Sequence, residues 1–298
     1  MSTRLTLACV TLVAALVGLN FSILKFGLEH SSPIMLTAAR SLVGGPVLLD
    51  FALLRGERPP RDRRDWGNIA VISFTITTVS SALLVIGTRR VPAGLASLLS
   101  STMPLFTAVL GVMLLGTSIT ARAAAGLAVG FVGTITLAIP AMGGGSQLVG
   151  VVVLVLSALA WAYGTVHMKW KEIASVSPVM LVAIQLMMSA VVLLPFGLLV
   201  EGTDEVDLGW GLFWPLMYSA IPSQAFTFAL LATVVRRASP THAAASAYLA
   251  PLFGVLFGWL LRDERLGALE VLGGALIVAG VYVVVTAAST PRLDAPEP

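Results

Sequence analysis

Long apolar stretches alternate with short polar gaps along almost the whole chain. The first stretch runs from Leu5 to about Ile23, and about 20 residues at 1.5 Å each are enough to cross the hydrocarbon core of a bilayer. A cleavable signal peptide has a shorter apolar region of about 7–15 residues, so we expect this stretch to be retained as a membrane helix. The pattern predicts ten such helices, near residues 5–28, 33–54, 66–88, 91–116, 120–140, 147–170, 177–200, 209–235, 239–262 and 265–287.

Proline and glycine mark several of the gaps. Pro33, Pro92 and Pro178 stand at or near a first helical turn, where the missing N–H of proline does no harm. The polar, glycine-rich gap MGGGSQ at 142–147 divides the chain almost in half. The last stretch, 289–298, is rich in proline and charge and is predicted to be a disordered cytoplasmic tail.

The composition agrees with a membrane protein. Hydrophobic residues make up 57% of the chain and charged residues 11%, with a mean hydropathy of +0.94. A soluble domain has roughly 25% charged residues, so this chain has too few to cover a surface that faces water. The basic residues lie in short gaps between apolar runs, which indicates membrane topology and excludes a nucleic-acid partner. The single cysteine, Cys9, cannot form an intramolecular disulfide.

The basic residues also predict an orientation. With the amino terminus in the cytoplasm, twelve of them fall inside and five outside, which favours an inner (plasma) membrane protein with both termini cytoplasmic. Much of the excess of basic residues inside comes from the loop 55–66. The alternative interpretation of this loop is a patch that binds lipid headgroups. The loop 201–210, predicted to lie outside, has no Lys or Arg. The inside set is Arg4, Arg55, Arg58, Arg61, Arg63, Arg64, Arg122, Lys169, Lys171, Arg236, Arg237 and Arg292, and the outside set is Lys25, Arg89, Arg90, Arg262 and Arg265.

One apolar sequence segment occurs twice in similar form. Residues 104–116 are PLFTAVLGVMLLG and residues 251–263 are PLFGVLFGWLLRD, at an offset of 147. The same offset brings the pair Arg89-Arg90 onto Arg236-Arg237 and several glycines onto glycines. A match over two helices and their loop indicates duplication of a multi-helix unit. The matched glycines are Gly111 with Gly258, Gly126 with Gly273, and Gly133 with Gly280.

Duplication of five crossings has a geometric consequence. Five is an odd number, so the second repeat (147–288) must enter the bilayer upside down relative to the first (1–141). This explains why the loop after Gly116 is neutral and the matching loop is RDER. Inverted repeats related by an axis in the membrane plane are characteristic of secondary transporters, whose binding site lies between the repeats. A non-transporting membrane scaffold or sensor is the rival interpretation.

Both copies of the repeated segment resemble the fourth-to-fifth helix signature of the EamA branch of the drug/metabolite transporter superfamily. The stretch Gly18-Leu19-Asn20-Phe21 and the stretch Ala38-Ala39-Arg40 are similar to the opening helices of that family, and the resemblance covers roughly 5–287. The first repeat has Thr117 where an acidic residue is often seen in the family, whereas the second repeat keeps Asp263-Glu264. We interpret this acidic feature as one of packing or helix capping. The resemblance implies ten helices, transport by alternating access, and export of amino acids or related metabolites.

Polar residues within the predicted helices are candidates for the transport pathway, because burying them in hydrocarbon is costly. Arg40 could face a substrate carboxylate, or it could satisfy carbonyl groups or extend to the headgroups. Gln185 occupies the matching place in the second repeat. Asn20 corresponds to Tyr163, and both could bind substrate or simply pack. Trp161 is two residues from Tyr163, so we expect only one of the two rings to meet a cavity.

The fourth and ninth predicted helices carry matching prolines. Ser97, Ser101 and Pro104 lie on one face of the fourth helix, where Pro104 frees the carbonyl of Ser100. This face could line the pathway and bend there, or it could serve close packing. The predicted substrate-binding residues are therefore Asn20, Arg40, Ser97, Ser101, Trp161, Tyr163, Gln185, Gln224 and Tyr248, with Pro104 and Pro251 as hinges.

Several functions are disfavoured by what the sequence does not contain. No Asp or Glu occupies the middle of a predicted helix, which argues against proton-coupled export of organic cations. No phosphate-binding loop, metal-ligand cluster or nucleophile–base set is found, so we expect neither an enzyme nor a cofactor. The sequence leads to a small-metabolite transporter, an amino-acid exporter first and an uptake carrier as the alternative. Monomer and homodimer both remain open.

Overall fold

A computed structural model describes residues 3–171, 176–231 and 246–288, and all regular structure in those ranges is helical. The predicted all-α membrane class is therefore confirmed. Within the described ranges, eight helical segments are long and apolar enough to cross a bilayer, and the apolar helix 247–262 is shorter. The gap predicted at 236–238 and the tail 289–298 lie outside the described residues, so the count of ten crossings stays a prediction.

The first half contains nine helical elements. They are α1 (Thr3–Gly27), α2 (Pro33–Leu54), α3 (Arg63–Ile72), the π-helix η1 (Ser73–Ser80), α4 (Ser81–Arg90), α5 (Ala93–Ser100), α6 (Met103–Leu115), α7 (Ala121–Ala138) and the 3₁₀-helix η2 (Pro140–Gly143). The described part of the second half contains α8 (Gly145–Trp170), α9 (Pro178–Val200), α10 (Trp210–Ala220), the π-helix η3 (Ile221–Phe226), α13 (Ser246–Arg262) and α14 (Ala268–Ala288).

Two predicted crossings are less regular than the sequence suggested. The third consists of α3, η1 and α4 in direct succession, so a π-helix interrupts its middle. The fourth is broken between α5 and α6. The break lies at Ser101 and Thr102, whose hydroxyls donate to the carbonyls of Leu98 and Leu99 at 2.6 Å each. These bonds compete with the backbone ladder just before Pro104, which has no N–H to give.

The ends of the long helices follow the local sequence. Pro33 and Pro178 occupy the first turn of α2 and α9, and Ser177 Oγ accepts a hydrogen bond from Met180 N at 3.1 Å. Gly56 and Gly202 follow the ends of the same two helices with φ of +73° and +68°. Only glycine adopts this left-handed conformation without a steric cost, so the chain reverses direction there.

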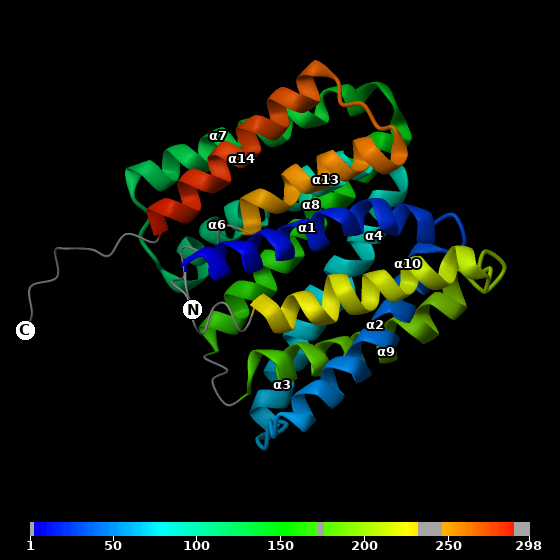
Figure 1. The fold of residues 1–298 in the computed structure, drawn as a ribbon. Helices are drawn as coiled ribbons and strands as arrows, with labels where there is room; N and C mark the ends of the chain where they lie inside the picture. Colours follow the sequence, from blue (N-terminus) through cyan, green and yellow to red (C-terminus); the bar gives the residue numbers. More distant parts are fainter. Residues whose placement is uncertain (1–2, 172–175, 232–245, 289–298) are drawn as a thin grey trace, which may run out of the picture.

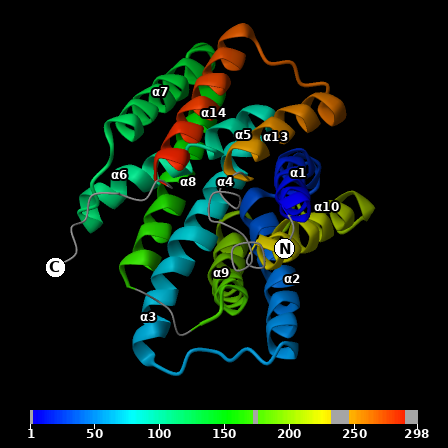
Figure 2. The ribbon, with the colours of Figure 1, turned by 60° about the vertical axis from the view of Figure 1, so that its left-hand side comes forward.

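The helices pack in a layered bundle. Helices α7 and α14 lie side by side at one edge, and α2 pairs with α9 towards the opposite edge (Figures 1 and 2). Between them, α1 packs against α13 and α10, while α8 packs against α4, η1, α5 and α6. The cavity described below as the candidate functional site lies in this middle layer.

Candidate functional site

A cavity of about 310 Å³ lies between the central helices. Its walls come from α1, α2, η1, α4, α5, α6, α8, η3 and α13, so residues from both halves of the chain line it. Eight of the eleven residues predicted from the sequence are among them: Asn20, Arg40, Ser97, Ser101, Pro104, Trp161, Gln224 and Pro251.

Four polar atoms of this lining are buried without a protein hydrogen-bond partner in the described part of the chain. They are Asn20 Oδ1, Arg40 Nε, Ser97 Oγ and Gln224 Oε1. Arg40 is 7% exposed and takes part in none of the ion pairs between described residues. A buried polar group without a partner costs about 1–3 kcal/mol, so this cluster is suited to hold a polar ligand.

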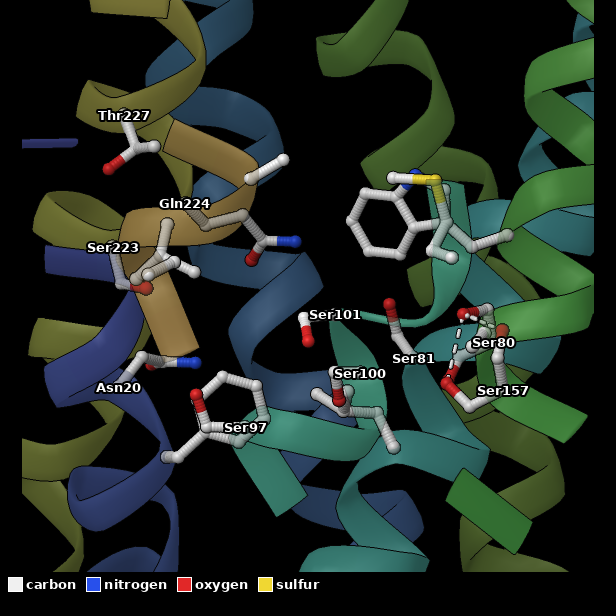
Figure 3. A pocket seen from close by; sticks show the side chains of 18 of the residues that line it. Asn20, Ser80, Ser81, Ser97, Ser100, Ser101, Ser157, Ser223, Gln224 and Thr227 are labelled. Carbon is white, nitrogen blue, oxygen red and sulfur yellow. Dashed lines mark hydrogen bonds between the residues drawn. The ribbon is translucent and has the colours of Figure 1, made fainter. Parts of the chain in front are cut away.

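The unpartnered groups come from different elements but face one space. Figure 3 shows the amides of Asn20 (α1) and Gln224 (η3) extending from one wall, with the hydroxyls of Ser81 and Ser101 facing them. On the far wall, Ser80 and Ser157 bind each other: Ser157 Oγ donates to Ser80 O at 2.7 Å and Ser80 Oγ to Ser157 O at 2.8 Å. The amide oxygens of Asn20 and Gln224, unpaired among the described residues, thus lie on one wall, and the mutually paired hydroxyls of Ser80 and Ser157 lie on the other.

Glycines determine how closely the helices pack on the side of the cavity that carries Asn20. A Cβ on Gly18 would lie 2.7 Å from the carbonyl oxygen of Ala250, so only glycine lets α1 approach α13 this closely. A Cβ on Gly254 would overlap Ser97 Oγ in the same way. These contacts hold Asn20 and Ser97 on the same side of the cavity.

Three predicted site residues lie away from the cavity. Tyr163 is 38% exposed and stacks on His167, with 6.1 Å between ring centroids. Trp161, two residues earlier, lines the cavity, as the prediction of opposite faces requires. Gln185 is buried between helices, and its backbone carbonyl accepts hydrogen bonds from the hydroxyls of Ser73 and Thr77. Tyr248 packs edge-to-face on Tyr282 at 5.5 Å.

Sequence reasoning missed most of the hydroxyl groups in the cavity. The signal was available in the polar run SFTITTVSS at 73–81, which interrupts an apolar crossing. The π-helix that turns part of this run inward is not visible in a hydropathy pattern. The missed lining residues with hydroxyls are Thr77, Ser80, Ser81, Ser100, Ser157, Ser223 and Thr227.

One end of the bundle is held by ion pairs, and we call it the ion-paired end (right-hand side of Figure 1). Its centre is Glu264, whose carboxylate accepts hydrogen bonds from the N–H groups of Ala93 and Gly94 at 2.8 and 3.1 Å. Lys25 Nζ lies 3.6 Å from the same carboxylate and donates to Val91 O at 2.7 Å. Glu264 thus acts as a cap for α5, in agreement with the interpretation made from the sequence.

Three further ion pairs occupy this end. Arg89 pairs with Glu205 at 3.0 Å, Arg262 with Glu29 at 2.6 Å, and His30 Nδ1 lies 3.5 Å from Asp207. Glu201 Oε2 accepts from the N–H groups of Ile34 and Met35 at the start of α2. All ion pairs recorded between described residues belong to this end. No group of three or more His, Cys, Asp or Glu that could hold a metal occurs among those residues.

Comparison with known proteins assigns this architecture to a family. The sequence profile of the EamA-like transporter family matches residues 4–139 and again residues 148–286. The chain belongs to this family. It is therefore a multi-pass membrane protein of a transporter family and not an enzyme, as its sequence predicted.

Two bacterial relatives of this EamA-family chain are named as a transporter and as an efflux pump. It is 27% identical to the uncharacterised inner membrane transporter YedA of Escherichia coli, over 90% of this chain and 86% of YedA. It is 28% identical to a probable amino-acid metabolite efflux pump of the same species, over 91% of this chain and 92% of the pump. A WAT1-related chloroplastic protein of Arabidopsis thaliana is 27% identical over 88% of this chain, which spans 64% of that longer relative. One crystal structure matches with a TM-score of 0.65 and 17% identity, covering 95% of this chain and 98% of that one, which is a likeness of fold alone.

Proposed function

We propose that the protein is a secondary transporter that exports amino acids or related small metabolites across the inner membrane by alternating access. In this proposal the chain crosses the bilayer ten times as two inverted five-helix repeats, with both termini in the cytoplasm. The observation that carries it is the cavity of unpartnered polar atoms enclosed by helices from both halves of the chain.

The crossing of α7 and α14 supports the inverted repeat. A Cβ on Gly133 would lie 2.7 Å from Gly273 O, and one on Gly280 would lie 2.6 Å from Gly126 O. At the repeat offset of 147, Gly126 corresponds to Gly273 and Gly133 to Gly280. Exchanging the repeats therefore turns one contact into the other, which is what a twofold axis between them requires.

Two further features recur at the same offset. Gly116, the residue after α6, has a φ of +64°, and Thr117 N donates to Gly111 O at 3.3 Å. Asp263, the residue after α13, has a φ of +51°, and Glu264 N donates to Gly258 O at 3.2 Å. The π-helices η1 and η3 also correspond at this offset, and both line the cavity. Conserved geometry in two sequence-divergent halves favours duplication.

Arg40 favours a substrate with a carboxylate. Among the described residues that line the cavity, Arg40 has the only charged side chain, and none of these residues is Asp or Glu. A guanidinium without an ion-pair partner would bind a carboxylate by charge-assisted hydrogen bonds. The unpartnered oxygens of Asn20, Ser97 and Gln224 could accept hydrogen bonds from an ammonium group of the same molecule. A zwitterionic substrate also agrees with the name of the E. coli relative, a probable amino-acid metabolite efflux pump.

The absence of a carboxylate from the described lining also bears on energy coupling. A proton-coupled site needs a group that titrates within the pathway, and Asp50 and Glu270 are not among the lining residues. We therefore propose facilitated or exchange transport. Uptake driven by a pH gradient alone, and abolished by changing Asp50 or Glu270, would contradict this part of the proposal.

The test is accumulation of a labelled amino-acid panel by inside-out membrane vesicles that contain the protein. We expect uptake of at least one zwitterionic or acidic solute, because uptake into such vesicles corresponds to export. Arg40→Gln should lower that uptake by about tenfold to a hundredfold, since a hydrogen bond to a charged group contributes about 1.5–3 kcal/mol. The folded yield should not fall, because Arg40 forms no ion pair with another described residue that the change would break.

Arg40→Lys is the matched control, since it keeps the charge but not the paired donors of a guanidinium. We expect it to retain part of the transport. Equal losses of folded yield and transport in Arg40→Gln would show that Arg40 is structural. Transport of no solute in either vesicle orientation would favour a scaffold or sensor.

A further inference from the structure

A second, separate depression opens on the outside of the bundle, between α2, α9 and the segment α3–η1. Its lining is almost entirely apolar, and we call it the lateral groove. Several of its side chains are substantially exposed, among them Phe74 at 56% and Val191 at 75%. Its lining residues are Leu49, Leu53, Pro59, Trp66, Ala70, Ser73, Phe74, Thr78, Met180, Ile184, Met187, Met188, Val191 and Val192.

The lateral groove has the length of one bilayer leaflet. Along α9 its lining runs from Met180 to Val192, and along α3–η1 it runs from Trp66 to Thr78. The α9 wall covers twelve steps of α-helix, or about 18 Å at 1.5 Å per residue. The α3–η1 wall, which is π-helical from Ser73, spans the same number of residues. Half of a hydrocarbon core is about 15 Å thick, so one extended acyl chain matches the groove in length as well as in polarity.

One end of the groove carries a cluster of arginines. Pro59 and Trp66 form this end, and the loop and first helical turn around them contain five exposed arginines: Arg55, Arg58, Arg61, Arg63 and Arg64. Arg55 lies over the ring of Phe51 at 5.4 Å. None of the five forms an ion pair with another described residue.

The acidic residues nearby do not cancel this charge. Residues 55–66 contain the five arginines against Glu57, Asp62 and Asp65, and Glu57 is bound by the hydroxyl of Ser177. Trp66 is 37% exposed, and its indole N–H donates to Pro60 O at 3.1 Å. A tryptophan with its polar tip satisfied and its ring at the groove entrance is typical of the interface between headgroups and acyl chains.

We propose that the lateral groove is a binding site for an anionic phospholipid, with one acyl chain along the groove and the phosphate among the arginines of the 55–66 loop. Membrane topology alone explains the basic loop but not the apolar groove that ends beside it. The corresponding loop after α9, residues 201–210, has no Lys or Arg, so this preference for an anionic headgroup belongs to one face of the protein only.

The site is also placed to affect the cavity. The π-helix η1 separates the two: Ser73, Phe74 and Thr78 line the groove, whereas Thr77 and Ser80 line the cavity. A lipid packed against η1 should therefore stabilise one arrangement of the cavity wall. This proposal rests on membrane insertion of the chain and does not depend on which solute is transported.

The test is native mass spectrometry of the purified full-length protein in detergent, titrated with palmitoyl-oleoyl phosphatidylglycerol or phosphatidylcholine. We expect phosphatidylglycerol to bind about tenfold more tightly or better, because each basic side chain near an anionic headgroup contributes roughly fivefold. The variant Arg58→Gln/Arg61→Gln/Arg63→Gln should lose most of this preference. This triple variant keeps Arg55, which packs over the ring of Phe51. With phosphatidylcholine present, its unfolding temperature should equal that of the wild-type protein.

Two controls separate the groove from simple adsorption to a basic surface. Arg58→Lys/Arg61→Lys/Arg63→Lys keeps the charge and should keep most of the preference. Ala70→Trp fills the groove with every arginine intact and should weaken phosphatidylglycerol binding by about fivefold or more. Equal affinity of the wild-type protein for both lipids would overturn the proposal. So would unchanged binding in Ala70→Trp, or displacement of the lipid by glycerol phosphate, which has the headgroup phosphate without acyl chains.

Discussion

The cavity and the ion-paired end solve the same physical problem in opposite ways. Both bury polar groups among apolar helices. At the ion-paired end, Glu264 is satisfied by two backbone N–H groups and Lys25. In the cavity, Asn20 Oδ1 and Gln224 Oε1 have no protein partner within the described ranges.

This difference separates polar groups that stabilise the fold from those available to a ligand. Removing a partnered group leaves its partner unsatisfied, which costs stability. Removing an unpartnered group costs the fold nothing and can relieve it, while any contact with a substrate is lost. Substitutions at the ion-paired end should therefore lower stability, whereas substitutions of the unpartnered cavity groups should lower transport and leave stability intact.

The largest effect on stability is expected for Glu264→Ala. The side chains of Glu264 and Lys25 are 13% and 18% exposed. Loss of the carboxylate leaves Lys25 without its ion-pair partner and the N–H groups of Ala93 and Gly94, in the first turn of α5, without an acceptor. We expect the free energy of unfolding to fall by about 2–3 kcal/mol. Thermal and denaturant unfolding of the purified protein in detergent measures it.

The neighbouring acid provides the control for this change. Asp263 is exposed and has a φ of +51°, which asparagine tolerates. Asp263→Asn removes the same charge from the same loop and should leave stability unchanged. Equal losses in both variants would mean that loop charge, rather than the cap on α5, stabilises this end.

A smaller effect, on transport, is expected for Trp161→Ala. Its ring lines the cavity, so its removal should raise the half-saturating substrate concentration by about tenfold, corresponding to burial of an aromatic side chain worth about 1.5–3 kcal/mol. Tyr163→Ala removes an aromatic ring two residues away that stacks on His167 instead. Concentration-dependent uptake by inside-out vesicles should show the shift for Trp161→Ala alone. If the two variants behave alike, the ring of Trp161 does not contact the substrate.

The smallest and sharpest comparison lies within the cavity itself. Ser97 and Ser157 both line the cavity. Ser97 Oγ has no hydrogen-bond partner among the described residues, whereas Ser157 Oγ donates to Ser80 O. Ser157→Ala should lower the free energy of unfolding by about 1 kcal/mol, whereas Ser97→Ala should leave it unchanged. Denaturant unfolding of the two variants side by side measures the difference. A destabilised Ser97→Ala protein would reveal a structural role for that hydroxyl.

The candidate site could be predicted in part. A polar residue in the middle of an apolar run is visible in the sequence, and this located Asn20, Arg40 and Gln224 on the cavity wall. Gln185 and Tyr248 have the same signal but face neighbouring helices, and a hydropathy pattern does not state which way a side chain points. The hydroxyls of the π-helix η1 were missed because its rotation depends on the packing of α8 and α9 against it.

The sequence by itself determined that the chain is a membrane protein, where most of its helices begin and end, and that one half repeats the pattern of the other. These properties follow from the transfer free energy of each segment, which depends on that segment alone. The tertiary structure decided which polar groups are paired and which face the cavity. Those outcomes depend on contacts such as Lys25 with Val91 and Glu264 with Ala93, between residues 66 and 171 positions apart, and only the packed bundle sets such distances.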